Sequence, residues 1–390
     1  MLMARLSGFL LSFKNLNLNK EINAVMRTLL TFLFLLSITH FGFTQNKHSI
    51  FKDSIDHAFD VSDFLIIKKG LLPVPMLITE PAVGYGGALG LLFFHDSYEN
   101  KKSPPGISGA FGGLTENGTW MVGALHAGFW KKDKIRYLGM AGYINVNIDY
   151  YGRLPKPVEM NMKTWLLLQQ IQFRFGESNF FGGFRYRLTP VTTTLDLPID
   201  IPGFSGIKLE SSMSELSAMF SYDSRNNIIS PTSGILAEVH GVYSDEWMGG
   251  DSRYGRITSG FIGLQPLGER WVIGGKLAAE SKLGDIPFYA KPFVQLRGVP
   301  FLKYQNDNIM SFEAEADWNI HKRWHLIGFA GVGNAFKEYN EFGDGNSVVS
   351  GGGGFRYLIA RKFGMKMGMD VAFSSDDFAF YITMGHAWAF

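Results

Sequence analysis

From residue 73 to the end of the chain, apolar residues recur at every second position in a long series of segments. Residues 312–319 (FEAEADWN) alternate apolar with acidic or amide side chains, and residues 378–390 (FAFYITMGHAWAF) show the same period. A period of two places successive side chains on opposite faces of a β-strand. The segments run about 9–14 residues, the length that a tilted strand needs to cross a bilayer. We therefore expect transmembrane β-strands.

The number of strands follows from where the two ends of the chain lie. Fifteen segments show the pattern: 82–95, 106–115, 119–130, 136–150, 162–175, 179–192, 211–224, 233–244, 253–266, 269–281, 307–319, 324–336, 349–360, 363–374 and 377–390. A chain that begins and ends in the periplasm must cross the membrane an even number of times. Either residues 71–79 form a further strand, which gives sixteen, or one segment is a loop, which gives fourteen; we favour sixteen. Because lipid does not tolerate an open sheet edge, the sheet is expected to close into an antiparallel β-barrel.

The chemistry of the two faces favours a membrane barrel over a soluble β-sandwich. Charged residues share one face with glycine and alanine, while aromatic residues occupy the other face. This is the arrangement of a polar lumen and a lipid-facing wall, whereas a sandwich would bury its apolar face inward. The chain contains 34 Phe, 15 Tyr, 8 Trp and 46 Gly, and past residue 45 it has no apolar run long enough for a transmembrane helix.

The first 70 residues predict export rather than a folded domain. Residues 26–44 (MRTLLTFLFLLSITHFGFT) combine a basic residue, a short apolar core and small residues before Gln45, which predicts a cleaved signal peptide; an N-terminal anchor helix is the alternative. Residues 1–25 are polar and are expected to precede the true start at Met26. Residues 45–70 form a short periplasmic segment, in which near-helical apolar spacing over 46–65 predicts one amphipathic helix. Residues 71–390 form the barrel.

Charge and cysteine content exclude several classes of function. Of 37 basic and 35 acidic residues, four basic and one acidic lie before residue 46, so the rest of the chain carries 33 and 34. A nucleic-acid footprint needs a strong basic excess, so no nucleic-acid partner is expected. The chain has no Cys, which excludes thiol catalysis, disulfides, thiolate metal sites and a lipid-modified N-terminal cysteine.

Residues 222–234 (YDSRNNIISPTSG) combine a charged pair with turn residues. Asp223 and Arg225 can satisfy the turn backbone and each other, while Pro231 and Gly234 fix the return of the chain. The segment resembles the aspartate–arginine turn and Pro-x-x-Gly of the bacterial surface antigen family, the barrel shared by BamA- and TamA-like outer-membrane assembly factors. The resemblance implies a periplasmic hairpin here, and an ordinary polar turn is the alternative.

Arg297 and Gly298 lie inside the longest expected loop, residues 282–306. They resemble the arginine–glycine motif of the family's sixth extracellular loop, which folds back into the barrel. An arginine has no stable place on a lipid face, and in a lumen a bidentate carboxylate would hold the loop. The family's aspartate on a following strand has no counterpart, because the matching stretch 329–333 reads FAGVG. The expected partners are therefore other carboxylates of the polar faces: Glu313, Glu315 and Asp370.

The C-terminal run also carries the resemblance. Residues 351–373 (GGGGFRYLIARKFGMKMGMDVAF) and 380–390 (FYITMGHAWAF) resemble the family's last three strands, with Asp370 at its late aspartate. Trp388 and Phe390 match the terminal signal by which barrels are recognised for insertion. The resemblance covers residues 210–390 and, loosely, 73–95. The family's periplasmic POTRA repeats are expected to be absent, because the segment between signal peptide and barrel is too short for one.

Three functions follow from these observations. The resemblance implies assistance with insertion or translocation of proteins or lipids at the outer membrane of a Gram-negative bacterium, through a seam between first and last strands. Glycines at 84, 86, 87 and 90 would weaken strand pairing there, or simply allow curvature. The alternative is a porin-like plugged pore for small solutes, with a wet lumen lined by polar residues. Those lining residues are Gln170, Gln172, Arg174, Arg185, Arg187, Asn145, Asn147 and Asp149.

A barrel enzyme is the third hypothesis and the least supported. Nine His are scattered, and none forms a defensible Ser-His-Asp or His-carboxylate spacing. His126, His240 and His386 are more simply interface or lumen residues. We expect no catalytic residue, no metal and no cofactor. The expected partners are outer-membrane lipids including lipopolysaccharide, the barrel assembly machinery during biogenesis, and a substrate protein or lipid.

Overall fold

The computed structural model describes residues 50–67, 71–78, 83–95, 106–150, 158–196, 207–287, 290–343, 345–375 and 378–388. The expected signal peptide, the segment before it, the cleavage site at Gln45 and the terminal Phe390 lie outside these residues. Among the described residues, no helix is both long and apolar enough to span a bilayer.

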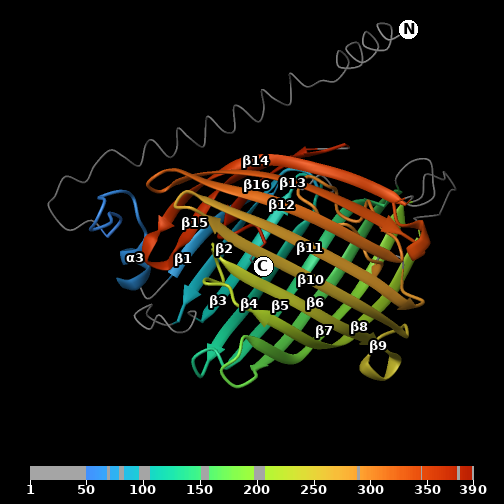
Figure 1. Ribbon diagram of the computed structural model, residues 1–390. Helices are drawn as coiled ribbons and strands as arrows, with labels where there is room; N and C mark the ends of the chain where they lie inside the picture. Colours follow the sequence, from blue (N-terminus) through green and yellow to red (C-terminus); the bar gives the residue numbers. More distant parts are fainter. Residues whose placement is uncertain are drawn as a thin grey trace, which may run out of the picture. The chain divides into compact units, whose positions relative to one another are not determined.

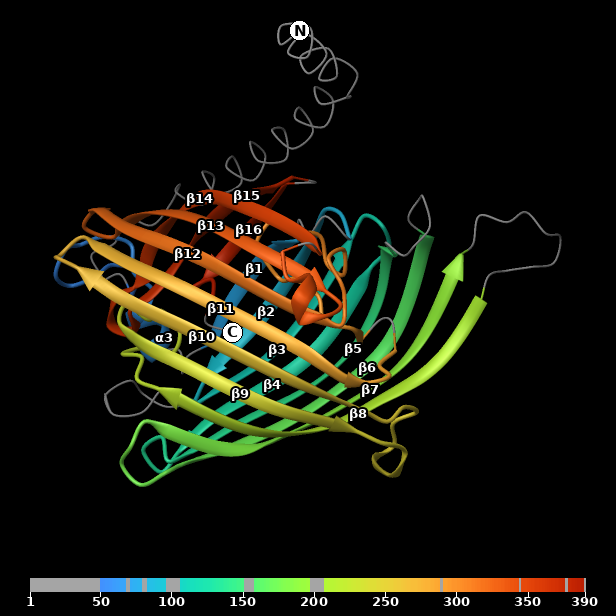
Figure 2. The same ribbon diagram turned by 45° about the vertical axis from the view of Figure 1, so that its right-hand side comes forward.

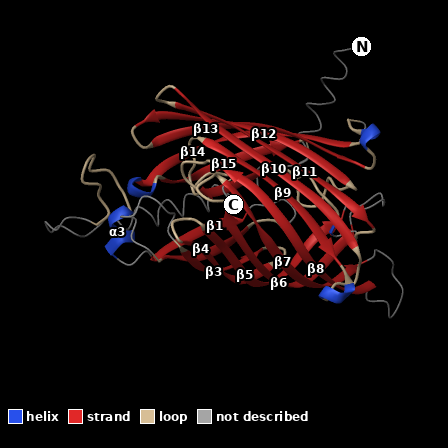
Figure 3. Cartoon of the chain, turned by 60° about the horizontal axis from the view of Figure 1, so that its bottom comes forward, coloured by secondary structure: helices blue, strands red, loops and turns tan. Residues whose placement is uncertain are grey.

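Sixteen antiparallel strands form one sheet in which each strand pairs with the next along the chain (Figure 1). The expected count of sixteen is confirmed, since residues 71–78 supply the additional strand. Figure 3 shows how little of the described chain is helical. The strands are β1 Leu71–Ile78, β2 Gly86–Phe94, β3 Ile107–Thr115, β4 Trp120–Trp130, β5 Ile135–Tyr150, β6 Val158–Arg174, β7 Phe180–Asp196, β8 Ile207–Asp223, β9 Gly234–Ser244, β10 Tyr254–Leu267, β11 Trp271–Gly284, β12 Asn308–His321, β13 Trp324–Phe336, β14 Asn346–Ala360, β15 Met365–Ser374 and β16 Phe378–Met384.

Aromatic side chains mark both edges of the lipid-facing wall. Near the periplasmic ends of β11 and β12, Trp271 and Trp318 are register partners and stack with ring centroids 5.3 Å apart. Towards the extracellular ends of β4–β6, the ring centroid of Tyr143 lies 5.2 Å from that of Trp120 and 4.9 Å from that of Trp165. Two such girdles flank the apolar band of a transmembrane barrel, because indole and phenol rings suit the lipid–water interface.

The wall is much taller on one side of the barrel than on the other. Strands β5–β8 have 16 or 17 residues, whereas β1–β3 have 8 or 9 and β16 has 7. Figure 2 shows the green strands of this group reaching past their neighbours. A crossing needs about 9–11 residues, so β5–β8 extend beyond the bilayer.

In the part of β5 and β6 that extends beyond the bilayer, polar side chains lie on the outer face and apolar side chains on the inner face. Above the Tyr143–Trp165 girdle the outer face carries Asn145 and Asn147, both hydrogen-bonded to Asn161. The inner face carries Ile148 and Met160, which are buried. Outside lipid, the polar face turns to water and the apolar face packs inward. The prediction that Asn145 and Asn147 line the lumen is therefore wrong; the side chain of Asp149 lies outside the described residues.

The N-terminal segment is mostly a tight hairpin rather than a helix. The only helix within residues 50–67 is α3, Ser62–Ile67. Before it, Lys52 bridges to Phe59, and His57 has a left-handed φ of 57°. The carboxylates of Asp53 and Asp56 accept backbone N–H groups two residues ahead, at 2.7 and 3.1 Å. These local hydrogen bonds compete with a helix, so the helix predicted over 46–65 is shorter than expected.

The last strand ends earlier than its sequence predicts. β16 stops at Met384, and Gly385 follows with a left-handed φ of 82°. Within the described residues, β16 forms a ladder with β15 only and β1 with β2 only. The barrel is thus nearly closed, with a seam between β1 and β16.

Candidate functional site: the inserted loop and the charged lumen

The loop between β11 and β12, residues 285–307, packs into the barrel on a wall made by β12–β14. Val294, Leu296 and Val299 are buried against Ile309, Ala335 and Val348. Room for the loop comes from glycine. A Cβ at residue 331 would lie 2.9 Å from Leu296, and one at residue 333 would lie 2.3 Å from Val294. Residue 331 is the position that matches the family's aspartate, which the sequence shows to be missing here, and the loop packs against this glycine.

The same loop reaches the tall wall on β5 and β6. Leu302 is buried with Ile148 and Met160, and Phe293 packs against this group. The loop therefore contacts both the β12–β14 wall and the inner apolar face of the extension.

Arg297 makes ion pairs with all three expected carboxylates. Its Nη2 lies 2.7 Å from Glu313 Oε1 and 2.7 Å from Glu315 Oε2, and its Nη1 lies 3.1 Å from Asp370 Oδ2. β12 positions the two glutamates on its lumen face, while β15 positions the aspartate. The guanidinium also stacks on the Phe329 ring at 3.5 Å. A planar cation with five donors can serve several carboxylates at once, which an ammonium group would do less well.

Gly298 brings the loop backbone against β15. Its φ is 82°, and a Cβ there would lie 3.0 Å from the carbonyl carbon of Ala372. Its N–H donates to Tyr381 Oη at 2.9 Å. Any larger residue would strain the backbone and push the loop away from the wall.

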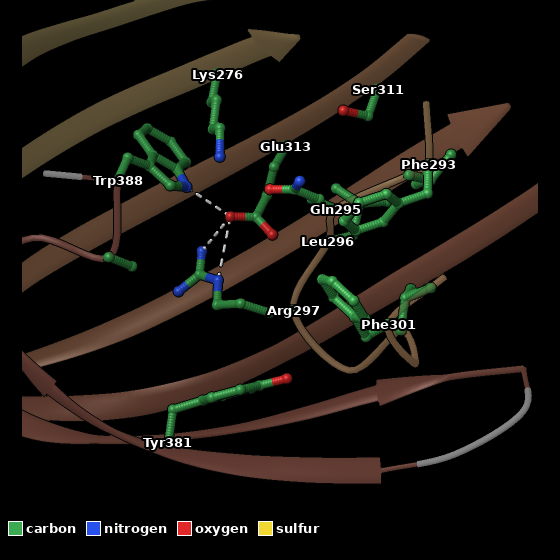
Figure 4. Close-up of a pocket in the computed structure, with 13 residues that line it drawn as sticks. Lys276, Phe293, Gln295, Leu296, Arg297, Phe301, Ser311, Glu313, Tyr381 and Trp388 are labelled. Carbon is green, nitrogen blue, oxygen red and sulfur yellow. Dashed lines mark hydrogen bonds and ion pairs between the residues drawn. The ribbon is translucent and has the colours of Figure 1, made fainter. Parts of the chain in front are cut away.

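Two further residues join this cluster: Arg356, to which the sequence assigned no role, and Trp388, which the sequence assigned only to the terminal insertion signal. Arg356 on β14 donates to both oxygens of Asp370, at 2.6 and 2.7 Å. Trp388 is only 6% exposed, and its Nε1 donates to Glu313 Oε1 at 2.6 Å. Figure 4 shows Arg297 and Trp388 converging on Glu313, beside a cavity of about 290 Å³ that Lys276 also lines. The residues after β16 thus turn into the lumen instead of continuing the wall.

The predicted periplasmic turn residues are also brought together. Asp223 ends β8, and Arg225 donates to both of its oxygens at 2.9 and 3.1 Å. Arg136 of β5 adds a contact of 2.7 Å to the same carboxylate. Gly234 has a φ of 103°, and a Cβ there would lie 2.4 Å from Ser224 O. Pro231 is buried in this turn.

A second arginine cluster fixes the N-terminal segment to the periplasmic turns. Arg323, between β12 and β13, lies 2.8, 2.6 and 2.6 Å from Asp53, Asp56 and Asp60. Hydrogen bonds from Arg361 lower the pKa of Asp53 below its ordinary 3.8, and hydrogen bonds from Arg323 lower the pKa of Asp56. Both aspartates are therefore anionic at neutral pH. Sequence reasoning missed this cluster.

The described residues offer little that resembles a catalytic or metal centre. No group of three or more histidine, aspartate and glutamate side chains among them is arranged to hold a metal ion. His386 lies 3.3 Å from Glu315, His240 lies 3.2 Å from Glu238, and His126 accepts or donates a hydrogen bond with Ser108 at 2.8 Å. That the chain has no enzymatic activity and no cofactor stays a prediction.

Comparison with known proteins gives one family match, which covers part of the chain. Residues 205–351 match the Omp85 superfamily domain. No sequence among the curated proteins matches the chain.

Solved structures share the fold. BamA from Haemophilus ducreyi lacking POTRA domains 1–3 is similar with a TM-score of 0.53 and 15% identity, over 80% of this chain and 70% of that one. CdiB from Escherichia coli gives 0.55 and 9%, and CdiB from Acinetobacter baumannii gives 0.51 and 10%, each over 80% of this chain. The alignments span only 61% and 59% of those two chains. At such identities the likeness concerns the fold alone.

Proposed function

We propose that this chain, whose residues 205–351 match the Omp85 superfamily domain, assists insertion or translocation of proteins or lipids through the seam between β1 and β16. The observation that carries the proposal is the seam itself. Two strands of 8 and 7 residues meet there without a ladder among the described residues, whereas every other neighbouring pair is laddered.

The physical argument is one of unpaired backbone groups next to lipid. Unpaired N–H and C=O groups in the hydrocarbon region are costly, and an unpaired edge is a template for another strand. Strands this short also fall below the span that an average bilayer needs, so the surrounding lipid must thin. A thinned bilayer beside an unpaired edge lowers the barrier for an incoming strand or lipid.

The proposed partners follow from this role. They are the outer-membrane lipids, including lipopolysaccharide, and a protein or lipid substrate, while the barrel assembly machinery would insert this chain itself. Trp388 and Phe390 are proposed to contribute to that recognition. The role requires no chemistry, so we propose that the chain is not an enzyme.

The test locks the seam. The chain has no Cys, so Leu72→Cys with Met384→Cys introduces the only thiols; both residues pack on one periplasmic apolar cluster. The assay measures how fast a urea-unfolded eight-stranded barrel folds into vesicles that contain the protein. The reduced variant should accelerate folding as the wild type does. The oxidised variant should fall to the rate of empty vesicles and recover on reduction.

The matched control is Val332→Cys with Val349→Cys, which are register partners on β13 and β14 and face outward. Oxidising this pair should leave the acceleration unchanged. Equal acceleration by a fully cross-linked seam variant would contradict the proposal, as would a wild type that gives no acceleration.

A plugged pore is the second candidate, favoured by the charged lumen. Loop 285–307 contacts both walls, so a pore would have to conduct around it or after it moves. Planar-bilayer conductance of the full chain, and of a variant in which residues 287–303 are replaced by a short glycine–serine linker, decides the matter. Equal conductance of the two proteins would show that the loop does not plug the barrel.

A further inference from the structure

A second lumen cavity, of about 340 Å³, lies between the inner faces of β6–β11 and the inserted loop. Its lining is rich in cations. Arg185 and Arg187 come from β7, Arg256 from β10 and Lys291 from the loop. The carboxylates that line it are Glu215 and Glu280. Excluding His240, the lining therefore carries four positive and two negative groups.

Both lining carboxylates already pair with cations of this cavity. Glu215 lies 2.5 Å from Arg187 and 2.8 Å from Arg256, and it accepts a hydrogen bond of 2.7 Å from Tyr254. Glu280 lies 2.7 Å from Arg256. Lys291 is 3.2 Å from Asp307, which it shares with Lys282 at 3.2 Å. Each carboxylate thus serves at least one cation, and most serve two.

After this pairing, two arginines still have guanidinium N–H groups that contact no carboxylate. Arg185 donates from Nε and Nη2 to the neutral Gln170 Oε1, at 2.9 and 2.7 Å, and forms no ion pair with any described carboxylate. The nearby Glu238 is instead paired with His240 at 3.2 Å. The Nε of Arg256 is buried without an acceptor among the described residues. A half-buried guanidinium with only a neutral partner is costly, and an anion that pairs with it would offset that cost.

We propose that this cavity is a binding site for a small phosphate-type oxyanion, with Arg185 as its principal ligand. Arg187 and Lys291 complete the cationic wall. The tetrahedrally arranged oxygens of a phosphate, or of a phosphorylated headgroup, match the forked donors of arginine. Because the loop supplies Lys291, Phe293 and Gln295 to the lining, the site is complete only while the loop is inserted. Anion binding and loop insertion therefore stabilise each other.

The site does not depend on the seam, so the two proposals fail separately. The experiment titrates sodium phosphate into the detergent-solubilised full chain, at constant ionic strength held with chloride, and follows the melting temperature. A ligand that binds only the folded state raises that temperature with concentration. The wild type should show saturable stabilisation. In Arg185→Gln the half-saturating concentration should rise at least tenfold.

Two variants keep the result interpretable. Arg253→Gln removes a cation that is 78% exposed on the β9–β10 loop, and its titration should match the wild type. Arg185→Lys preserves the charge but not the fork and should lie between wild type and Arg185→Gln.

A parallel arm uses protein reconstituted in phosphatidylcholine vesicles with or without phosphatidic acid. It distinguishes a free anion from a lipid headgroup as the source. Stabilisation in either arm that Arg185→Gln abolishes supports the oxyanion site. No stabilisation of the wild type in both arms, or stabilisation that Arg185→Gln leaves intact, overturns it.

Discussion

The tall wall of β5–β8 and the short strands at the seam differ in how completely their backbone groups are paired with neighbouring strands. The tall strands have up to 17 residues and pair along most of that length; β6 pairs with β7 from Glu159 to Thr164 and from Leu167 to Arg174. β16 has 7 residues and pairs with one neighbour. Backbone pairing in lipid is the main constraint on such walls, so the stability of the barrel is unevenly distributed around it.

The inserted loop joins these two regions. At one end Arg297 pairs with Glu313, Glu315 and Asp370 on β12 and β15, close to the seam. At the other end Leu302 packs on the tall wall. The polar anchor and the apolar anchor can be removed one at a time, which separates their contributions.

The largest effect is expected from Arg297→Ala. It leaves Glu313, Glu315 and Asp370 without their shared cation, and breaking one partner of a buried ion pair costs about 3–5 kcal/mol. The loop should leave the β12–β15 wall, so its cleavage by added protease and the single-channel conductance should both rise. Arg297→Lys should show a smaller rise.

A matched control is Arg270→Ala in the periplasmic β10–β11 turn, which should change neither quantity. If Arg297→Ala also leaves both unchanged, the ion pairs do not hold the loop. Pairing Arg297→Glu with charge reversal at one carboxylate at a time would then show whether any single partner matters.

A smaller effect is expected at the apolar anchor. Leu302→Ala removes a side chain that is 4% exposed and packed on Ile148 and Met160, at a cost of about 2–4 kcal/mol. Protease cleavage should increase near residue 302, while conductance should change less than in Arg297→Ala because the polar anchor stays in place. Equal or larger effects on conductance would reverse the assignment of the two anchors.

The smallest effect is expected from a change of pH at the N-terminal segment. The lowered pKa of Asp53 and Asp56 means that their ionised forms stabilise docking above the ordinary carboxyl pKa of 3.8. This contribution is lost as the pH falls below 3.8 towards the lowered values. Protease accessibility of residues 50–67 should be constant between about pH 5 and 8 and should rise only in stronger acid.

Asp53→Asn should release the segment at neutral pH. Asp63→Asn, which breaks only an exposed pair with Lys362, should not. Release of the wild-type segment between pH 5 and 8 would contradict the assignment.

The fold and part of the site could be predicted from local sequence. Period-two alternation identifies strands because lipid requires every second side chain to be apolar, and the need for an even crossing number corrected the count. Arg297 could be assigned a lumen position because an arginine is costly against lipid. Its three carboxylates were recognisable as members of polar faces.

The remaining features depend on geometry that sequence does not encode locally. Arg356 reaches Asp370 only through the register of β14 on β15. Trp388 continues the apolar alternation in sequence, yet the left-handed Gly385 turns it into the lumen. The inversion of faces at Asn147 and Ile148 depends on where the bilayer ends. The docking of Asp53 on Arg323 joins segments far apart in the chain.

The most direct test of the central claim is the distance across the seam in a bilayer. Spin labels are attached at Leu72→Cys and Met384→Cys, and the distance between them is measured by pulsed electron–electron double resonance. The distance distribution should be broad, with a longer component that grows in thinner lipids. The same labels on Val332→Cys and Val349→Cys, within the laddered wall, should give one narrow distance in every lipid. A seam distribution as narrow as the control, and as insensitive to bilayer thickness, would contradict the account.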